Sequence, residues 1–225
     1  MEVGPQVGGG PATVPPAAPI EGRFVRLEPT AASHAAGLYE RSHASPDDAA
    51  IWTYMPYGPF ADADEMSAWV ATCVGSTDPL FFTVVDRATG APVGMASLLN
   101  IDTRMRHLEL GHIWYARDAQ RGRANTETAY LFLRAAFDGW GYRRAEWKCD
   151  ALNARSRTAA ERLGFTFEGV FRQHMLVKDR NRDTAWYSLL DGEWPGAGAA
   201  FAAWLDPANF DADGRQRASL AELRG

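Results

Sequence analysis

The sequence predicts a mixed α/β fold, in which strands and amphipathic helices alternate along the chain. Strands are indicated at residues 80–86 and 92–99, which the turn Ala88-Thr89-Gly90 joins as a hairpin. A helix is indicated at Thr126–Trp140, where apolar side chains recur at helical spacing and Gly141 acts as the stop. Hydrophobic residues make up 46% of the 225, which is the composition of an ordinary globular domain with a sizeable core.

The remaining elements follow in order from the N-terminus. Residues 1–20 are rich in Gly and Pro without a periodic apolar pattern, so we expect a disordered tail. The main domain is expected at residues 21–194, and residues 195–225 form an extension that packs through Phe201 and Trp204. Within the domain we expect a strand at 23–28, helices at 30–40 and 63–73, a turn at 100–105, a strand at 107–115, a strand at 145–149, a short helix ending at 163, and strands at 165–177 and 184–190 around the turn 178–181.

Composition excludes several functional classes. The net charge of −5 argues against bulk nucleic-acid binding. The two cysteines form neither a disulfide framework nor a metal set, and Cys149, in a predicted strand, is expected to be a buried structural thiol. No apolar run approaches the ~18–20 residues that span a membrane, and the N-terminus lacks a signal-peptide pattern, so the default expectation is a cytoplasmic protein.

The passage from Asp150 to Phe165 is the most informative motif. It is predicted to run strand, loop, short helix and glycine stop, with Asn153 and Ser156 where short polar side chains satisfy free backbone groups. The pattern Asn-x-x-Ser before a helix ending in Leu163-Gly164-Phe165 resembles the coenzyme A site of the GCN5-related N-acetyltransferases (GNAT). For residues 21–194 the resemblance implies a strongly twisted, mostly antiparallel mixed sheet with helices on both faces.

Further residues resemble one branch of that superfamily, the RimJ/RimL type that acetylates ribosomal-protein N-termini. They are Glu109-Leu110-Gly111-His112, Gln120-Arg121-Gly122, Asn125-Thr126-Glu127 and Phe167-Glu168-Gly169-Val170. The resemblance implies acetyl-CoA as co-substrate, no metal, and a protein N-terminus or small amine as acceptor. It also implies direct attack in a ternary complex, without an acyl-enzyme.

The loop before the strongest helix is the expected pyrophosphate site, because a helix N-terminus offers free N–H groups and a favourable dipole. Its proposed residues are Gln120, Arg121, Gly122, Arg123, Ala124, Asn125 and Thr126, with the two arginines adding positive charge. The family pattern Gln/Arg-x-x-Gly-x-Gly/Ala lacks both glycines here. Asn125 is expected to take over the unusual backbone angle, and Thr126 to cap the helix and bind phosphate. The alternative is a solvated basic turn.

The pantetheine arm is expected beside the strand 107–115. In the family this strand parts from its neighbour, and the resemblance assigns backbone contacts to Ile113, Trp114 and Tyr115. Asn153 is expected to bond the arm from the other side. For the side chains of Trp114 and Tyr115, plain core packing is the alternative.

Acetyl transfer to an amine needs one proton removed from the amine and one supplied to the leaving thiolate. The resemblance assigns the second role to Ser156, for which a helix N-cap alone is the alternative. The branch associates a glutamate with the base where this chain has Met175 or a neighbour, so His174 is the first candidate. His112 and Glu109 are rivals, and a water relay without a dedicated base stays open.

An aromatic loop between the first two helices is expected to cover the acceptor, with two residues of the last strand as the opposite wall. The acceptor residues are Trp52, Tyr54, Met55 and Tyr57, with Phe60 nearby, and Trp186 and Tyr187. The alternative is a satellite hydrophobic cluster. For the whole chain, a non-catalytic acyl-CoA sensor and an antibiotic- or amine-detoxifying acetyltransferase are the alternative functions. The C-terminal extension and exposed aromatic residues favour a homodimer.

Overall fold

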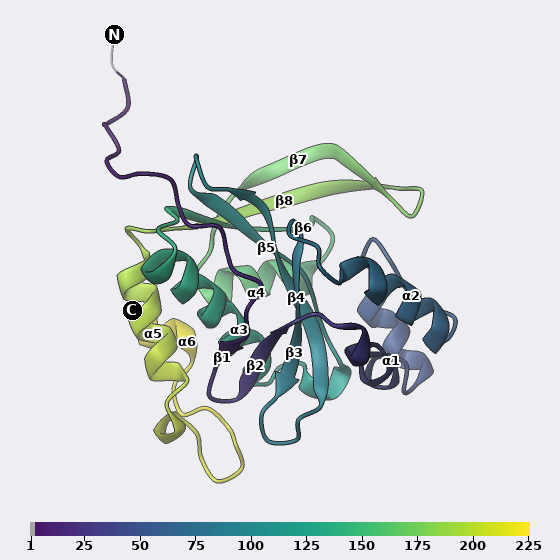
Figure 1. Ribbon diagram of the computed structural model, residues 1–225. Coiled ribbons are helices and arrows are strands. Elements are labelled where there is room, and N and C mark those ends of the chain that lie inside the picture. The colour runs from purple at the N-terminus through teal and green to yellow at the C-terminus, as the bar shows by residue number, and fades with distance from the viewer. Residues whose placement is uncertain (1–2) are drawn as a thin grey trace.

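The computed structural model describes residues 3–225 and confirms the mixed α/β fold (Figure 1). One eight-stranded sheet has the order β1-β2-β3-β4-β5-β6-β8-β7. Neighbouring strands are antiparallel except β5 and β6, which are parallel. The strands are β1 (Ile20–Glu21), β2 (Val25–Pro29), β3 (Leu80–Asp86), β4 (Pro92–Asp102), β5 (His107–Tyr115), β6 (Arg144–Asp150), β7 (Thr166–Val177) and β8 (Arg180–Leu190).

Helices cover both faces of this sheet, as expected, with α1 and α2 on one side and α3 to α6 on the other (Figure 1). They are α1 (Ala35–Ser42), α2 (Ala63–Cys73), α3 (Arg123–Arg134), α4 (Ala154–Leu163), α5 (Trp194–Trp204) and α6 (Leu220–Arg224). Short 3₁₀ segments stand at Ala32–His34, Pro46–Trp52, Arg117–Ala119 and Pro207–Asn209, and a π turn at Ala135–Gly139 follows α3.

Several boundaries differ from the sequence prediction. The helix predicted at 126–140 begins three residues earlier, at Arg123, because Gly122 rather than Thr126 occupies the N-cap position. The helix predicted at 30–40 is a 3₁₀ turn followed by α1. The strand β4 runs three residues into the predicted turn at 100–105, and β8 begins at Arg180 instead of residue 184. The predicted α2, β3 and β5 have the expected bounds.

Two hydrophobic cores stabilise the layers. The larger core lies between the sheet and the α3–α6 side, and it contains Phe82, Phe132, Leu163 and Phe201. The smaller core lies under α1, α2 and the segment between them, and it contains Trp52, Met66, Phe81, Met95 and Trp114. Both packing residues expected in the C-terminal extension, Phe201 and Trp204, are buried in the larger core.

The N-terminal segment forms no regular element over residues 3–19. Within it, Ala12 is buried, its N–H donates to the carbonyl of Thr103, and the N–H of Thr13 donates to the carbonyl of Trp140. Residues 1–2, where the predicted tail starts, lie outside the described residues. Disorder of residues 1–20 stays a prediction.

Candidate functional site

The central feature of the site is the point at which β5 and β6 part. These parallel strands pair only over His107–Leu110 and Arg144–Trp147. Beyond that point β5 continues on β4, and β6 continues on β8 as far as Asp150. The facing edges of residues 111–115 and 148–150 therefore carry backbone N–H and C=O groups that no strand ladder uses. Such groups need hydrogen-bond partners, and an amide-bearing ligand supplies them.

A bulge in β5 marks where the strands part. Ser97 of β4 pairs with Gly111 and Met95 pairs with Trp114, so β5 holds one residue more than β4 between these pairs. His112 takes up the extra length with a left-handed φ of 50°. A bulge bends its strand and increases the local twist, which turns β5 away from β6. The parting strand expected from the family resemblance is thus present.

Two helix N-termini lie at the same edge of the sheet, because the carboxyl ends of parallel strands meet there. A short turn after β5 leads into α3, and β6 leads into α4 (Figure 1). Each N-terminus presents backbone N–H groups without intrahelical acceptors and the positive end of a helix dipole. The place where β5 and β6 part, here called the cleft, therefore leads to an edge suited to an anionic group such as a pyrophosphate.

In the loop before α3, which lacks the two glycines of the family pattern, the left-handed backbone conformation is at a different residue from the one predicted. Arg121, not Asn125, adopts the left-handed conformation, with φ at 59°. Asn125 lies inside the first turn of α3, so the expectation that it supplies the unusual angle is wrong. Thr126 is fully buried, and its hydroxyl accepts a hydrogen bond from the Arg162 guanidinium at 2.8 Å, so it is not a cap.

Arg123 also differs from the expectation. Its guanidinium lies 3.9 Å from the ring centroid of Phe210 and 4.6 Å from that of Phe24, between segments remote from the cleft in sequence. Cation–π contacts of this kind hold the side chain. Arg123 can therefore offer a ligand its backbone N–H at the start of α3, whereas the guanidinium charge expected at the phosphates is directed elsewhere.

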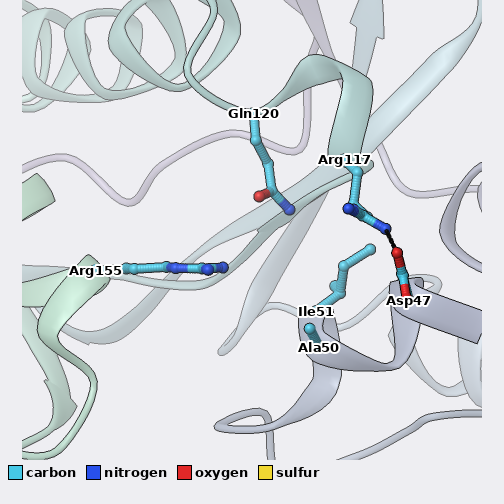
Figure 2. A pocket seen from close by; sticks show the side chains of 6 residues that line it. All are labelled: Asp47, Ala50, Ile51, Arg117, Gln120 and Arg155. Carbon is cyan, nitrogen blue, oxygen red and sulfur yellow. Dashed lines mark ion pairs between the residues drawn. The ribbon is translucent and has the colours of Figure 1, made fainter.

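A hollow of about 270 Å³ lies between the loop before α3, the start of α4 and the 3₁₀ segment Pro46–Trp52 (Figure 2). Gln120 reaches into it from the loop before α3 and Arg155 from the start of α4, while Arg117 forms an ion pair with Asp47 at 2.9 Å. The residues that line it are Asp47, Ala50, Ile51, Arg117, Gln120 and Arg155. Except for Gln120, these residues were absent from the sequence prediction. Arg155 could have been found, since it stands between Asn153 and Ser156.

The start of α4 has the local structure predicted for it. Asn153 is the N-cap, and its side-chain oxygen accepts from the N–H of Ser156 at 3.1 Å. The indole N–H of Trp147 donates to the hydroxyl oxygen of Ser156 at 3.0 Å, so the serine accepts here and keeps its own O–H to donate. Beside it, Cys149 is a buried free thiol, as predicted, and burial raises its pKa while the Ser156 hydroxyl partly opposes that shift.

The three candidate bases have different surroundings. Burial first, and the charge of Arg182 second, lower the pKa of His112 to about 4, so its imidazole is neutral at neutral pH. Glu109 is buried and engaged, with Lys148 Nζ and Asn100 Nδ2 each 2.6 Å from its carboxylate. Burial raises the pKa of Glu109, and Lys148 opposes the rise.

His174 is the most accessible of the three. It lies on the irregular part of β7, and its Nδ1 is 3.0 Å from the Thr184 hydroxyl. Its ring centroid is 6.0 Å from that of Trp186, on the sheet face that carries the acceptor candidates. Its other ring nitrogen has no protein partner within residues 3–225, which leaves one nitrogen available to a ligand.

The aromatic loop expected at the acceptor side packs against the bulge in β5. Tyr57 stacks on His112 with ring centroids 5.7 Å apart, and Trp52 lies 4.9 Å from Trp114. Tyr57 and Trp52 are therefore both part of the smaller core and neighbours of the bulge, whereas Met55 is half-buried at its margin. The two interpretations of the loop, acceptor wall and hydrophobic cluster, are compatible.

The loop is fastened at two further points. The hydroxyl of Tyr54 donates to the carbonyl of Leu152 at 3.1 Å, beside the start of α4. From the tip of the β7–β8 hairpin, Lys178 donates to the carbonyls of Trp52, at 3.0 Å, and Gly58. The loop thus connects the α4 side of the cleft with the far hairpin.

The prediction for the last strand is half wrong. Trp186 lies on the sheet face of Lys148, whose ammonium is 4.4 Å from the centre of its ring. Tyr187 points to the opposite face because side chains alternate along a strand. It is fully buried in the larger core, and its hydroxyl accepts from Arg157 at 3.1 Å. Tyr187 therefore cannot form the acceptor wall.

Among residues 3–225, no helix is both long and apolar enough to cross a membrane. The same residues contain no cluster of three or more His, Cys, Asp or Glu side chains that could hold a metal ion.

Comparison with known proteins agrees with this geometry. A model of the acetyltransferase (GNAT) domain matches residues 25–166, more than half of the chain. A crystal structure of a GCN5-related N-acetyltransferase from Brucella melitensis is 45% identical, with a TM-score of 0.93 over 96% of this chain and 98% of that one. A GNAT-family structure from Chromobacterium violaceum is 38% identical, with a TM-score of 0.78 over 87% of this chain and 99% of that one.

A curated relative from Bacillus subtilis, YdaF, bears a provisional name as a ribosomal N-acetyltransferase. It is 33% identical over 107 residues, which cover 48% of this chain. The aligned part is 58% of the relative's own length, less than two thirds of it.

Proposed function

Because the chain belongs to the acetyltransferase (GNAT) family, we propose that it transfers an acetyl group from acetyl-CoA to a primary amine, on a protein N-terminus or a small molecule. The observation that carries the proposal is the parting of β5 and β6, with Ser156 at the start of α4 beside it. The amine reacts directly with the bound thioester, and no residue is acylated.

The residues present fit acetyl-CoA. The free backbone groups of Ile113 and its neighbours on β5 suit the two amides of the pantetheine arm. Without such a ligand, these backbone groups would have no hydrogen-bond partner in the sheet. The amide nitrogen of Asn153 is free to bond the arm from the other side, because only its oxygen is used in capping. The start of α3, from Gln120 to Asn125, suits the pyrophosphate, with Arg155 as a further cation at the mouth.

Acetyl-CoA supplies an activated acyl group when bound, and the chain's own residues handle the protons. A carbon–nitrogen bond forms as the carbon–sulfur bond breaks, so the amine loses a proton and the sulfur gains one. Ser156 holds a proton at its hydroxyl oxygen, and the indole N–H of Trp147 on that oxygen makes the proton easier to give. His174, through its free ring nitrogen, is the proposed base, and a water chain past neutral His112 is the competing route.

The Ser156→Ala variant tests the acid. We expect turnover to fall about 10²- to 10⁴-fold, the usual contribution of a positioned proton donor, with little change in acetyl-CoA affinity. The change also leaves the Trp147 N–H without its acceptor, so thermal unfolding is measured alongside and assays are run well below the midpoint. Thr158→Ala, at an exposed position on the same helix, is the matched control. Unchanged turnover in Ser156→Ala would remove Ser156 from the mechanism.

The turnover assay also distinguishes the enzyme from a non-catalytic acyl-CoA sensor, and amine acetylation from O-acetylation. Thiol release is followed with amines of several classes and with matched alcohols, and acetyl-CoA binding is measured by calorimetry. Binding without turnover on any acceptor supports a sensing module, and turnover on alcohols alone indicates O-acetylation. Absence of binding contradicts both the enzyme and the sensor.

A further inference from the structure

Arg182 is a half-buried cation on the acceptor face without an anionic partner. It lies on β8, where it pairs with Met175 of β7. The last pair between β6 and β8 joins Asp150 to Thr184, so Arg182 lies two residues beyond the end of that pairing. Strand alternation puts it on the face of Thr184 and Trp186, the face of the acceptor candidates. Its Nε is buried, and no side chain or carbonyl among residues 3–225 accepts from its guanidinium. By contrast, Arg117, which lines the hollow beside α3, is paired with Asp47.

Of the eleven side-chain polar atoms that are buried without a protein partner among residues 3–225, six lie on this face of the sheet or in the loop that covers it. They are Trp52 Nε1, Tyr57 Oη, His112 Nδ1, Trp114 Nε1, Arg182 Nε and Trp186 Nε1. Trp52 and Trp114 are 0% and 3% exposed, so their indole N–H groups have no access to bulk water. The rings of Trp52, Tyr57, His112 and Trp114 contact one another in sequence around the bulge of β5.

These atoms are nearly all donors. An indole or guanidinium nitrogen can only donate, and the phenol of Tyr57 can donate as well. A buried donor without an acceptor is unfavourable by about 1–3 kcal/mol, so a native site that gathers several of them calls for a ligand rich in acceptors. An ammonium group cannot accept a hydrogen bond and a hydroxyl carries no charge, whereas a carboxylate offers two acceptor oxygens and a charge that complements Arg182.

We propose that the acceptor is an amine that also carries a carboxylate, and that Arg182 binds this carboxylate beside the reacting nitrogen. The inference rests on the proposed acetylation of amines and names the class of amine. The guanidinium fork matches a carboxylate in a bidentate geometry.

Two sources offer this chemistry. One is a small amino acid, and the other is a peptide end whose second residue is acidic. The contacts favour the small acceptor, because Lys178 joins the hairpin tip to the loop at Trp52 and Gly58 across the acceptor face. A peptide would have to pass this connection.

The test compares matched acceptors that differ only in the carboxylate. β-Alanine is compared with β-alaninamide, and Ala-Asp amide with Ala-Asn amide, each pair at equal concentrations of neutral amine. We expect kcat/KM in the wild-type protein to favour the acidic member of one pair about ten- to a hundredfold, as a charge-assisted contact allows. Arg182→Met should abolish this preference and leave both acetyl-CoA affinity and turnover of the neutral member within about twofold, whereas Arg182→Lys keeps part of it.

Arg180→Met is the control, because it removes the same charge from an exposed position on the same strand. Equal kcat/KM within both pairs, or a preference that survives in Arg182→Met, overturns the inference. So does an equal loss on every acceptor, which would assign Arg182 to the acetyl-CoA side. Titration of the acetyl-CoA-free protein with N-acetyl-β-alanine and with its amide decides the point without turnover. A failure of acetyl transfer is therefore distinguishable from a failure of carboxylate recognition.

Discussion

The buried carboxylate of Glu127 offers the sharpest test of how the fold supports the cleft. Glu127 lies in α3, is 3% exposed, and accepts three backbone N–H groups from the turn that enters β2. Its Oε1 is 2.6 Å from Arg23 N, and its Oε2 is 2.6 Å from Phe24 N and 2.7 Å from Val25 N. The carboxylate thus ties the helix that begins at the cleft to the first long strand.

The perturbation is Glu127→Gln, which keeps the shape and removes the charge. The amide oxygen can serve the two N–H groups that meet Oε2, but the new amide nitrogen then faces the N–H of Arg23 as a donor against a donor. One hydrogen bond to a charged acceptor is lost, the other two are weakened, and a buried donor is left unsatisfied. With about 1.5–3 kcal/mol for a charge-assisted bond, the expected loss is about 2–4 kcal/mol of unfolding free energy.

Urea denaturation and thermal unfolding measure this loss. For a chain of this size, 1 kcal/mol shifts the midpoint by about 2–4 °C, so Tm should fall by at least about 4 °C. Glu40→Gln, an exposed glutamate on α1, is the matched control and should change stability by less than about 0.5 kcal/mol. A loss below about 1 kcal/mol in Glu127→Gln, with unfolding still two-state, would refute the assignment of these three bonds as charge-assisted.

Two further predictions concern the site and its support. The pKa of His112 is about 4 in the folded protein against 6.5 unfolded, so the unfolded chain binds the proton first as pH falls. The free energy of unfolding therefore falls as the pH drops from ~6.5 to ~4, by about 3 kcal/mol in total. In His112→Asn this part of the pH dependence, measured by urea denaturation, should be absent. Gly164→Ala should cost about 1–2 kcal/mol, because φ there is 99° and the new Cβ would lie 3.0 Å from Arg224. Gly192→Ala, at an open position, is its control, and an equal effect of both changes would contradict the assignment.

The sequence predicted best those features that depend on neighbours in the chain. The cap at Asn153 and the left-handed stop at Gly164 follow from residue types within one helix length, and both are confirmed. The bounds of β3 and β5 are likewise confirmed, because alternation and flanking turns specify them locally.

The errors have a shared physical origin in tertiary contacts. The start of α3 moved to Arg123 because Gly122 can cap and because Thr126 is buried against Arg162, a residue of another helix. Tyr187 was assigned to the acceptor face by its neighbour Trp186, although strand alternation alone separates the two. Arg182 was missed because nothing local distinguishes it from the exposed arginines around it. Its place on the acceptor face follows only from the pairing of β8 with β6 and β7 in three dimensions.

The proposed cofactor half and the proposed acceptor half of the site differ in how the chain builds them. The cofactor half consists of two strand–loop–helix units, β5 to α3 and β6 to α4, in which strand end and helix N-terminus are neighbours in sequence. The acceptor half depends on contacts such as Lys178 with Trp52, 126 residues apart, and Tyr54 with Leu152, 98 residues apart. Substitutions in the loop or the hairpin can therefore alter the acceptor half without disturbing either helix N-terminus. Acceptor identity should consequently change more readily than acetyl-CoA binding, and it is the loop 52–60 and the hairpin around residues 174–186 that must be varied to change it.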